Sequence, residues 1–124
     1  MAATNERIRE VVERYVALVG SGTAAEIVDL YAEGATVEDP VGSDVLTTRE
    51  QIAAFYGNLE GLEMETRLVA LRIAGGEAVF HFEIVTKADG ATYTLAPFDA
   101  MTFDDDGRIT TMRAFWSGED MVAG

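Results

Sequence analysis

Two aspartates and three tyrosines of this 124-residue chain have positions that suit them for chemistry. Asp99 stands in YTLAPFDAMTF, residues 93–103, whose alternation is typical of a β-strand. Side chains alternate between the faces of a strand, so Asp99 shares its face with apolar and aromatic residues, namely Tyr93, Leu95, Pro97, Met101 and Phe103. A carboxylate that faces a core or a pocket must find a partner or keep a proton. We therefore predict that Asp99 either has a specific partner or stays protonated.

A second carboxylate, Asp39, ends the short stretch TVEDP on the same side as Val37. The following Pro40 favours an extended backbone at Asp39 and removes a backbone donor, which would hold the carboxylate in one orientation. A general base of this kind could move a proton on a bound substrate. The ordinary alternative is an aspartate that only forms the turn before proline.

Three of the four tyrosines, Tyr15, Tyr31 and Tyr56, fall one on each of three expected helices, each on the apolar side. Tyrosine is a good core residue, but a buried hydroxyl still needs a partner. Three phenols directed at a sheet that carries a misplaced aspartate favour a shared hydrogen-bond network over three separate core tyrosines.

Composition excludes several other kinds of site. The chain has no cysteine and a single histidine, His81, which lies on the wetter face of its predicted strand, so we expect no metal and no thiol chemistry. A formal charge of −13 disfavours nucleic acid and anionic membranes as partners. No apolar run approaches the roughly 18 residues of a membrane span, and residues 1–5 lack a signal-peptide pattern, so a cytoplasmic protein is expected.

The pattern along the chain changes from helical to alternating after Gly61. Helices are expected at residues 4–19, after the capping box at Thr23 as far as Tyr31, and after the capping box at Thr48. Strands are expected at residues 36–39, 63–74, 77–87, 92–104 and 108–117, the last four separated by glycine-containing turns.

These elements predict one α+β domain spanning residues 1–124. Three N-terminal helices would pack on the concave face of a strongly curved, mainly antiparallel sheet, forming a cone with a cavity; a flat α+β sandwich is the alternative. Residues 108–117 are apolar on both faces, one with Thr110, Met112, Ala114 and Trp116 and the other with Ile109, Thr111, Arg113 and Phe115. Helices can cover only one of these faces, so we expect a homodimer packed through the other.

Several stretches also resemble a known family: RYVALV (14–19), ATVEDPVGS (35–43), REQIAAFY (49–56), APFDAMTF (96–103) and GRITTMRAFWS (107–117). Over nearly the whole chain they are similar to the ketosteroid isomerases (steroid Δ5-isomerases) of the nuclear-transport-factor-2-like (NTF2-like) superfamily. The resemblance implies a conical fold, no cofactor, a homodimer, and a steroid or similar apolar ketone as substrate. It also implies an isomerase that moves the C5=C6 double bond of 3-oxo-Δ5-steroids to C4=C5 by intramolecular proton transfer through a dienolate.

The resemblance assigns a role to each candidate residue. Asp39 would be the general base, and Tyr15 and Asp99 would donate hydrogen bonds to the oxyanion. Tyr56 and Tyr31 would support Tyr15. The apolar substrate wall would comprise Phe55, Phe82, Ile84, Met112 and Trp116. The opposite protonation states of the two acids are an established feature of ketosteroid isomerases.

Two other functions fit the same fold. Related epoxide hydrolases and cyclases use an Asp-Arg-Asp arrangement that holds a water; here Arg113 lies opposite Met112 and Trp116, whereas Arg67 and Arg72 lie on opposite faces, so one of them could point inward. A non-catalytic module for an apolar ligand is the third interpretation. It leaves a carboxylate and three tyrosines around a pocket without a purpose, although buried polar groups cost stability unless they are satisfied.

Overall fold

The structure is a computed structural model that describes residues 2–124. The helices are α1 (Asn5–Ser21), α2 (Ala24–Val28), α3 (Arg49–Gly57) and the short 3₁₀ helix η1 (Gly118–Asp120). The strands are β1 (Tyr31–Glu38), β2 (Glu63–Ala74), β3 (Glu77–Ala88), β4 (Ala91–Leu95), β5 (Phe98–Phe103), β6 (Ile109–Phe115) and β7 (Val122–Ala123).

Two helices begin where the capping boxes at Thr23 and Thr48 predict, and the first begins at Asn5, one residue after the predicted start. The side chain of Thr4 accepts a hydrogen bond from the Arg7 N–H at 3.1 Å, and both Thr23 and Thr48 form complete capping boxes. Such caps satisfy N–H groups that have no partner inside the helix. Helix α1 continues to Ser21, two residues beyond the predicted end.

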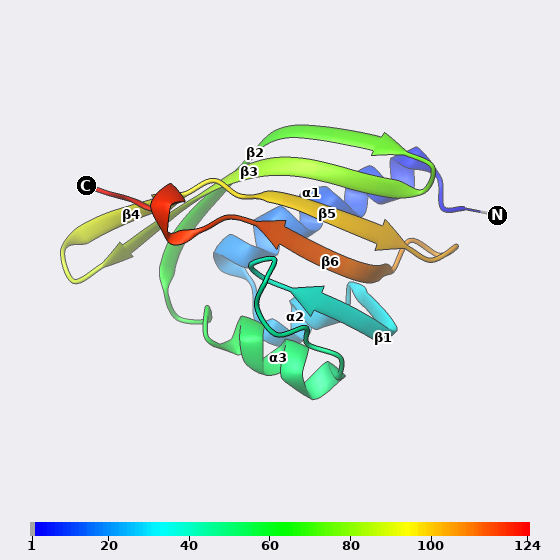
Figure 1. Ribbon diagram of the computed structural model, residues 1–124, viewed down its shortest axis with the longest axis horizontal. Helices are drawn as coiled ribbons and strands as arrows, with labels where there is room; N and C mark the ends of the chain where they lie inside the picture. The colour runs from blue at the N-terminus through cyan, green and yellow to red at the C-terminus, as the bar shows by residue number, and fades with distance from the viewer. Residues whose placement is uncertain (1) are drawn as a thin grey trace.

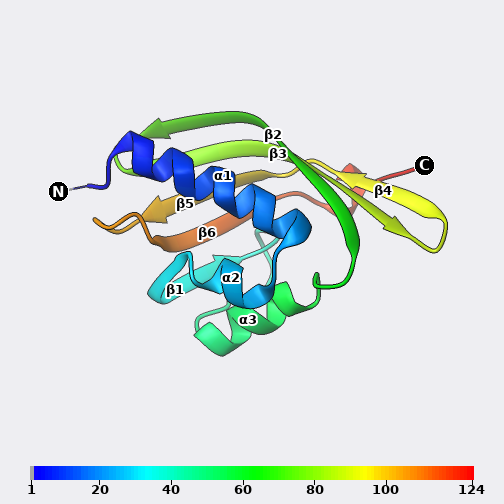
Figure 2. The same ribbon diagram turned by 180° about the vertical axis from the view of Figure 1, so that it is seen from behind.

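Seven strands form one curved, open sheet, and the three α-helices lie on one side of it (Figures 1 and 2). The strand order is β1-β6-β5-β3-β4-β7, with β2 on the other side of β3. Only the β1–β6 pair is parallel among the described strands. The prediction of an α+β fold with a curved, mainly antiparallel sheet is therefore confirmed, and the flat sandwich is wrong.

The strand expected at residues 92–104 is divided into β4 and β5 at Ala96 and Pro97. Proline has no N–H to donate to a neighbouring strand. Strand β3 changes partner at this point: residues up to His81 pair with β5, and residues from Ile84 onward pair with β4. The register against β3 is the same on both sides of this interruption, and the Phe82 N–H still donates a hydrogen bond to the Pro97 carbonyl at 3.3 Å. Asp99 therefore lies on the predicted face.

Two β-bulges correct the predicted faces of other residues. Thr110 is an extra residue between the pairs Thr102–Thr111 and Phe103–Ile109, so Ile109 points inward and is fully buried, contrary to the prediction.

A second bulge at Val69 has the same effect in β2, between the pairs Leu68–Phe82 and Ala70–His81. Arg67 and Arg72 therefore both lie exposed on the outer face, and the prediction that they occupy opposite faces is wrong.

Tyr31 begins β1 instead of extending the second helix, which was also predicted wrongly. Helix α2 ends at Val28, and the Leu30 carbonyl accepts a hydrogen bond from the Ile109 N–H at 2.9 Å. Pairing with a distant strand thus overrides the local helical pattern. Tyr31 remains 3% exposed, so it is still a core residue.

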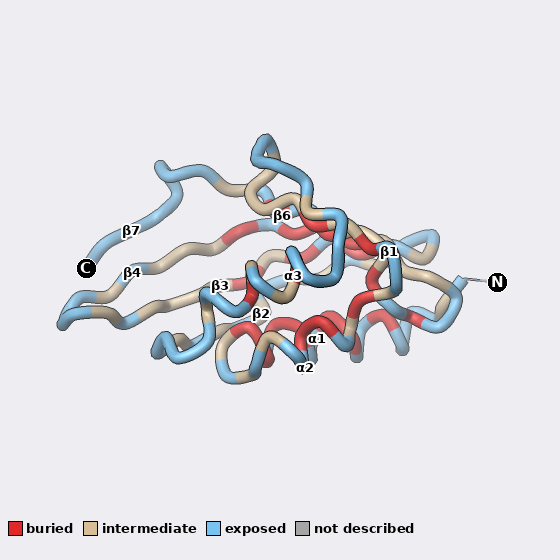
Figure 3. The backbone as a smooth tube through the Cα atoms, turned by 90° about the horizontal axis from the view of Figure 1, so that it is seen from below, coloured by how far each residue is buried: buried red, intermediate tan, exposed pale blue. Residues whose placement is uncertain are grey.

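The core lies between α1 and the inner face of the sheet, where buried segments of the chain face one another (Figure 3). The outer face carries an apolar patch of three exposed side chains, Val79, Phe98 and Phe115, hereafter the outer patch. His81 lies beside it and stacks on Phe98 with ring centroids 4.2 Å apart, as expected for an outer-face residue. Among residues 2–124, no helix is long and apolar enough to span a membrane.

Candidate active site

A mostly apolar cavity of ≈ 280 Å³ lies between the helices and the inner face of the sheet. Its walls come from α1, α3, the segment after α3, strands β2 to β5, and the C-terminal segment. The lining residues are Tyr15, Val19, Asp39, Phe55, Tyr56, Leu59, Leu62, Met64, Phe82, Ile84, Thr86, Tyr93, Leu95, Pro97, Asp99, Trp116 and Met121. Both candidate acids therefore face one chamber.

Three phenols form a continuous hydrogen-bond chain beside this cavity. The hydroxyl of Tyr56 lies 2.9 Å from that of Tyr15 and 2.6 Å from that of Tyr31. The three rings come from α3, α1 and the start of β1, and none is more than 3% exposed. Burial raises the pKa of each phenol well above 10.0, so all three keep their protons at neutral pH.

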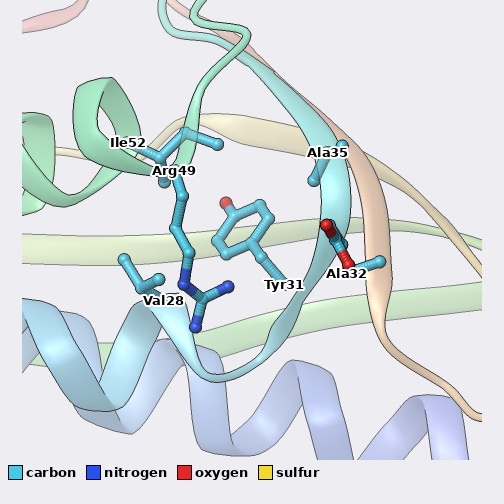
Figure 4. A pocket seen from close by; sticks show the side chains of 8 residues that line it. Val28, Tyr31, Ala32, Ala35, Arg49 and Ile52 are labelled. Carbon is cyan, nitrogen blue, oxygen red and sulfur yellow. The ribbon is translucent and has the colours of Figure 1, made fainter.

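Tyr31 closes the far end of this chain, next to a second hollow on the surface. Val28, Arg49 and Ile52 lie on one side of its ring and Ala32 and Ala35 on the other (Figure 4). This hollow is larger, ≈ 450 Å³, and Arg49 at its edge forms an exposed ion pair with Asp29 at 3.3 Å. Neither candidate acid lines it, so the candidate active site is the smaller cavity.

Besides the three tyrosines, Asp99 is the one buried polar or charged residue among residues 2–124, with 1% of its surface exposed. It lies on β5 opposite Phe80 of β3 and Ala114 of β6, and its Oδ1 has no hydrogen-bond partner within the described chain. Burial, and secondarily the charge of Asp39, raise the pKa of Asp99 well above 3.8. A protonated Asp99 can donate a hydrogen bond to a ligand.

Asp39 has a different environment at the end of β1. It is half-buried, and the indole Nε1 of Trp116 donates a hydrogen bond to its Oδ1 at 2.7 Å. Burial raises the pKa of Asp39 above 3.8, and the bond from Trp116 opposes that rise by stabilising the anion. The two acids therefore differ in their surroundings: an indole N–H bonds Asp39, whereas Asp99 is buried with no hydrogen-bond partner for its Oδ1.

The hydrogen bond from Trp116 makes a test possible. In Trp116→Phe, Asp39 loses its donor but keeps an aromatic neighbour, so its pKa should rise further. The acid limb of the pH profile of kcat/KM, which reports the free enzyme, should then move to higher pH. Steady-state rates across the acidic and neutral range measure the shift, and an acid limb at the wild-type position would contradict it.

Most of the predicted substrate wall lines the cavity, with one exception. Phe55, Phe82, Ile84 and Trp116 line it, whereas Met112 is fully buried in the core between strands and does not reach the cavity. Met112 lies in the middle of the sheet, paired with Val37 of β1 on one side and with Met101 of β5 on the other. Its side chain is therefore packed in the core and does not line the cavity.

Sequence reasoning missed the outer half of the cavity. Leu62, Met64, Thr86 and Met121 line that half but had no predicted role. For Thr86 a signal existed, because strand alternation places it on the face of Phe82 and Ile84. Met121 had none, since it comes from the C-terminal segment. Among residues 2–124, no group of three or more acidic, histidine or cysteine side chains could hold a metal ion.

Comparisons with known proteins identify relatives that are similar to this chain in sequence or in fold. A family model of the SnoaL-like domain matches residues 12–112. A steroid Delta-isomerase of Nocardioides simplex is 47% identical over 115 residues, covering 93% of this chain and 94% of that protein. A solved structure of SalBIII, an epoxide hydrolase/cyclase-like enzyme with a role in pyran ring formation in the polyether salinomycin, shares the fold with a TM-score of 0.87. It is 24% identical and covers 96% of this chain and 97% of that chain.

Proposed function

The chain belongs to the SnoaL-like domain family of NTF2-like proteins, and we propose that it is an isomerase that converts 3-oxo-Δ5-steroids into their conjugated Δ4 isomers. One observation carries the proposal. A single apolar cavity holds two carboxyl groups in opposite environments, Asp99 buried without a partner for Oδ1 and Asp39 held by an indole donor. The identity of 47% to a steroid Delta-isomerase supports the same function.

In the proposed reaction, the steroid ketone enters the closed end of the cavity. Ionised Asp39 removes a proton from C4, and the electron pair moves through the carbonyl group to leave a dienolate with negative charge on the ketone oxygen. Asp39 then returns the proton to C6, and the double bond finishes between C4 and C5. One carboxyl serves both carbons provided that it reaches both C4 and C6. The proton that it removes is the one that it returns, so no co-reactant is needed.

Tyr15 and protonated Asp99 donate hydrogen bonds to the oxygen as it becomes negative. Donors fixed in advance in a dry site stabilise such charge by about 3–4 kcal/mol each. Tyr56 and Tyr31 contribute by holding the Tyr15 hydroxyl in one place through the bonds of 2.9 Å and 2.6 Å. The apolar walls exclude water, which strengthens both donors.

The hydrolase alternative has less support than isomerisation. Within residues 2–124 no arginine lines the cavity, so the Asp-Arg-Asp arrangement has no candidate arginine there. Arg67 forms an exposed ion pair with Glu83 at 3.7 Å, and Arg113 pairs with Glu38 at 3.1 Å. The likeness to SalBIII concerns the fold alone.

Turnover of 5-androstene-3,17-dione tests the proposed function directly. The absorbance of the conjugated enone should rise far above the buffer rate when protein is added. No rise would overturn the isomerase. If the steroid changed the fluorescence of Trp116, the single tryptophan, without any enone being formed, the non-catalytic binding module would be the better account.

We also propose a homodimer through the outer patch. Val79, Phe98 and Phe115 are 51%, 50% and 44% exposed, and Phe98 and Phe115 are neighbours across the β5–β6 ladder. Apolar side chains gathered in this way on one sheet face favour burial against a second copy.

The dimer can be tested by one charged substitution in the outer patch. Light scattering should give twice the chain mass of 13.4 kDa for the wild type and the single mass for Phe98→Glu. Val45→Glu, a matched change at an exposed loop residue, should stay dimeric. A monomeric wild type at micromolar concentration would refute the dimer.

A further inference from the structure

Two hydroxyl groups in the cavity have no part in the proposed reaction. Thr86 on β3 and Tyr93 on β4 both line the cavity and face each other as partners across the β3–β4 ladder. Within the described chain neither hydroxyl has a hydrogen-bond partner, although each can donate and accept. Apart from Tyr15, Asp39, Tyr56, Asp99 and Trp116, they are the lining residues with a polar group in the side chain.

These hydroxyls lie at the opposite end of the cavity from Asp99. On β3, Phe80 pairs with Asp99, whereas Thr86 pairs with Tyr93. Six residues of strand separate the two positions, roughly 20 Å of backbone at about 3.3 Å per residue. Between them the wall is apolar, with Phe82, Ile84, Leu95 and Pro97.

Exposure shows which end is open. Asp99 is 1% exposed, whereas Tyr93 is 39% exposed and two other lining residues, Leu62 and Met121, are 44% and 42% exposed. The β3–β4 hairpin extends beyond the helices with the C-terminus beside it (Figure 1). A ligand whose ketone is at the closed end, and which is long enough to reach the opening, therefore has its other end beside Thr86 and Tyr93.

The C-terminal segment holds Tyr93 in place at this opening. Strand β7 pairs with β4 so that Ala123 is the partner of Tyr93, and the Gly124 N–H bonds the Thr92 carbonyl at 2.9 Å. The same segment brings Met121 to the cavity. Tyr93 is thus part of a three-stranded ribbon, β3-β4-β7, and not of a free hairpin edge.

Given the proposed function, we infer that Thr86 and Tyr93 bind a second oxygen of the substrate, at the end remote from the reacting ketone. The preferred ligand is then a rigid, fused-ring ketone with an oxygen at each end, and not a hydrocarbon nucleus with a single oxygen. Both hydroxyls can donate to a carbonyl, and both can accept from a hydroxyl, so either group at the far end fits. Such contacts act on binding and hardly on the chemical step, because they lie far from the reacting carbons.

The test compares two steroids that differ only at the far end. Androst-5-ene-3,17-dione carries the second oxygen, and androst-5-en-3-one lacks it. Wild-type protein should have the higher kcat/KM for the dione. Thr86→Val and Tyr93→Phe, which remove one hydroxyl each with little change of shape, should each reduce this preference by about 3- to 10-fold, through KM.

Thr94→Val is the matched control, because Thr94 is the neighbour of Tyr93 in β4 and does not line the cavity. It should leave the ratio between the two substrates unchanged. A ratio unchanged in both Thr86→Val and Tyr93→Phe would overturn the inference, as would an equal loss for both steroids, which would indicate a merely structural role.

A binding measurement separates this inference from the proposed function. If wild-type protein turned over neither steroid, the proposed isomerase function would fail, but the preference for a ligand with the second oxygen could still be measured. Quenching of Trp116 by androst-4-ene-3,17-dione and androst-4-en-3-one gives two dissociation constants without catalysis. Tighter binding of the dione that weakens about 3- to 10-fold in Tyr93→Phe supports the second oxygen site, and equal constants for both ligands overturn it.

Discussion

Asp39→Asn should lower kcat for 5-androstene-3,17-dione by about 10³-fold or more, within the range expected for losing a general base. The amide cannot take a proton from C4, yet its oxygen can still accept the hydrogen bond that Trp116 donates to Asp39 at 2.7 Å. The cavity should therefore keep its shape. Stopped-flow or steady-state absorbance of the enone measures the rate, and quenching of Trp116 measures binding of the Δ4 product, which should be retained.

The matched control is Glu38→Gln, which changes the preceding carboxylate in the chain. Glu38 does not line the cavity; it accepts a bond from Arg113 at 3.1 Å on the other side of the strand. This variant should turn over steroid at nearly the wild-type rate. If Asp39→Asn retained more than a tenth of wild-type kcat, Asp39 would not be the base.

Asp99→Leu should lower kcat by about 10²- to 10³-fold, the usual cost of removing one oxyanion donor. Leucine fills the site without a proton to donate, whereas Asp99→Asn keeps an N–H donor and should lose much less activity. The order wild type, Asn, Leu is the diagnostic result. Equal rates for the Asn and Leu variants would mean that Asp99 does not donate to the ligand.

The protonation of Asp99 also predicts how stability depends on pH. The folded-state pKa lies well above 3.8, so between these values the folded state binds a proton that the unfolded state has lost. The free energy of unfolding must then fall as pH rises, by about 1.4 kcal/mol per pH unit from this group. The contribution of protonated Asp99 is complete below about pH 4 and is lost as pH rises through the folded-state pKa.

Urea unfolding of wild type and Asp99→Asn at several pH values isolates this effect, because the other acidic residues are common to both proteins. The difference in unfolding free energy should shift in favour of the asparagine variant as pH rises. Parallel curves would show that Asp99 is ionised in the folded protein, and the oxyanion role would then be excluded.

Local patterns predicted the beginnings of the helices and the face of Asp99. A threonine cap acts within one helical turn, so Thr23 and Thr48 mark helix starts wherever the helix later packs. Strand alternation has a period of two residues, and therefore the face of Asp99 followed from its neighbours even though Pro97 interrupts the strand.

The same patterns were wrong where one strand holds an extra residue or changes partner. The bulges at Val69 and Thr110 reverse the faces beyond them, and only the register against the neighbouring strand reveals them. Tyr31 belongs to β1 and not to the second helix, because the carbonyl of the preceding residue, Leu30, accepts a hydrogen bond from β6. Long-range pairing of this kind has no local signature.

By itself the sequence determined which groups are available for chemistry: carboxylates and phenols, with no cysteine and a single histidine. It also determined that Asp99 lies on an apolar face. Only the tertiary structure decided that Asp99 is 1% exposed, that Tyr56 joins Tyr15 to Tyr31, and that the C-terminal segment completes the cavity. The reason is physical, because the pKa of an acid depends on every group that displaces water from it, and those groups come from strands and helices far apart in the chain.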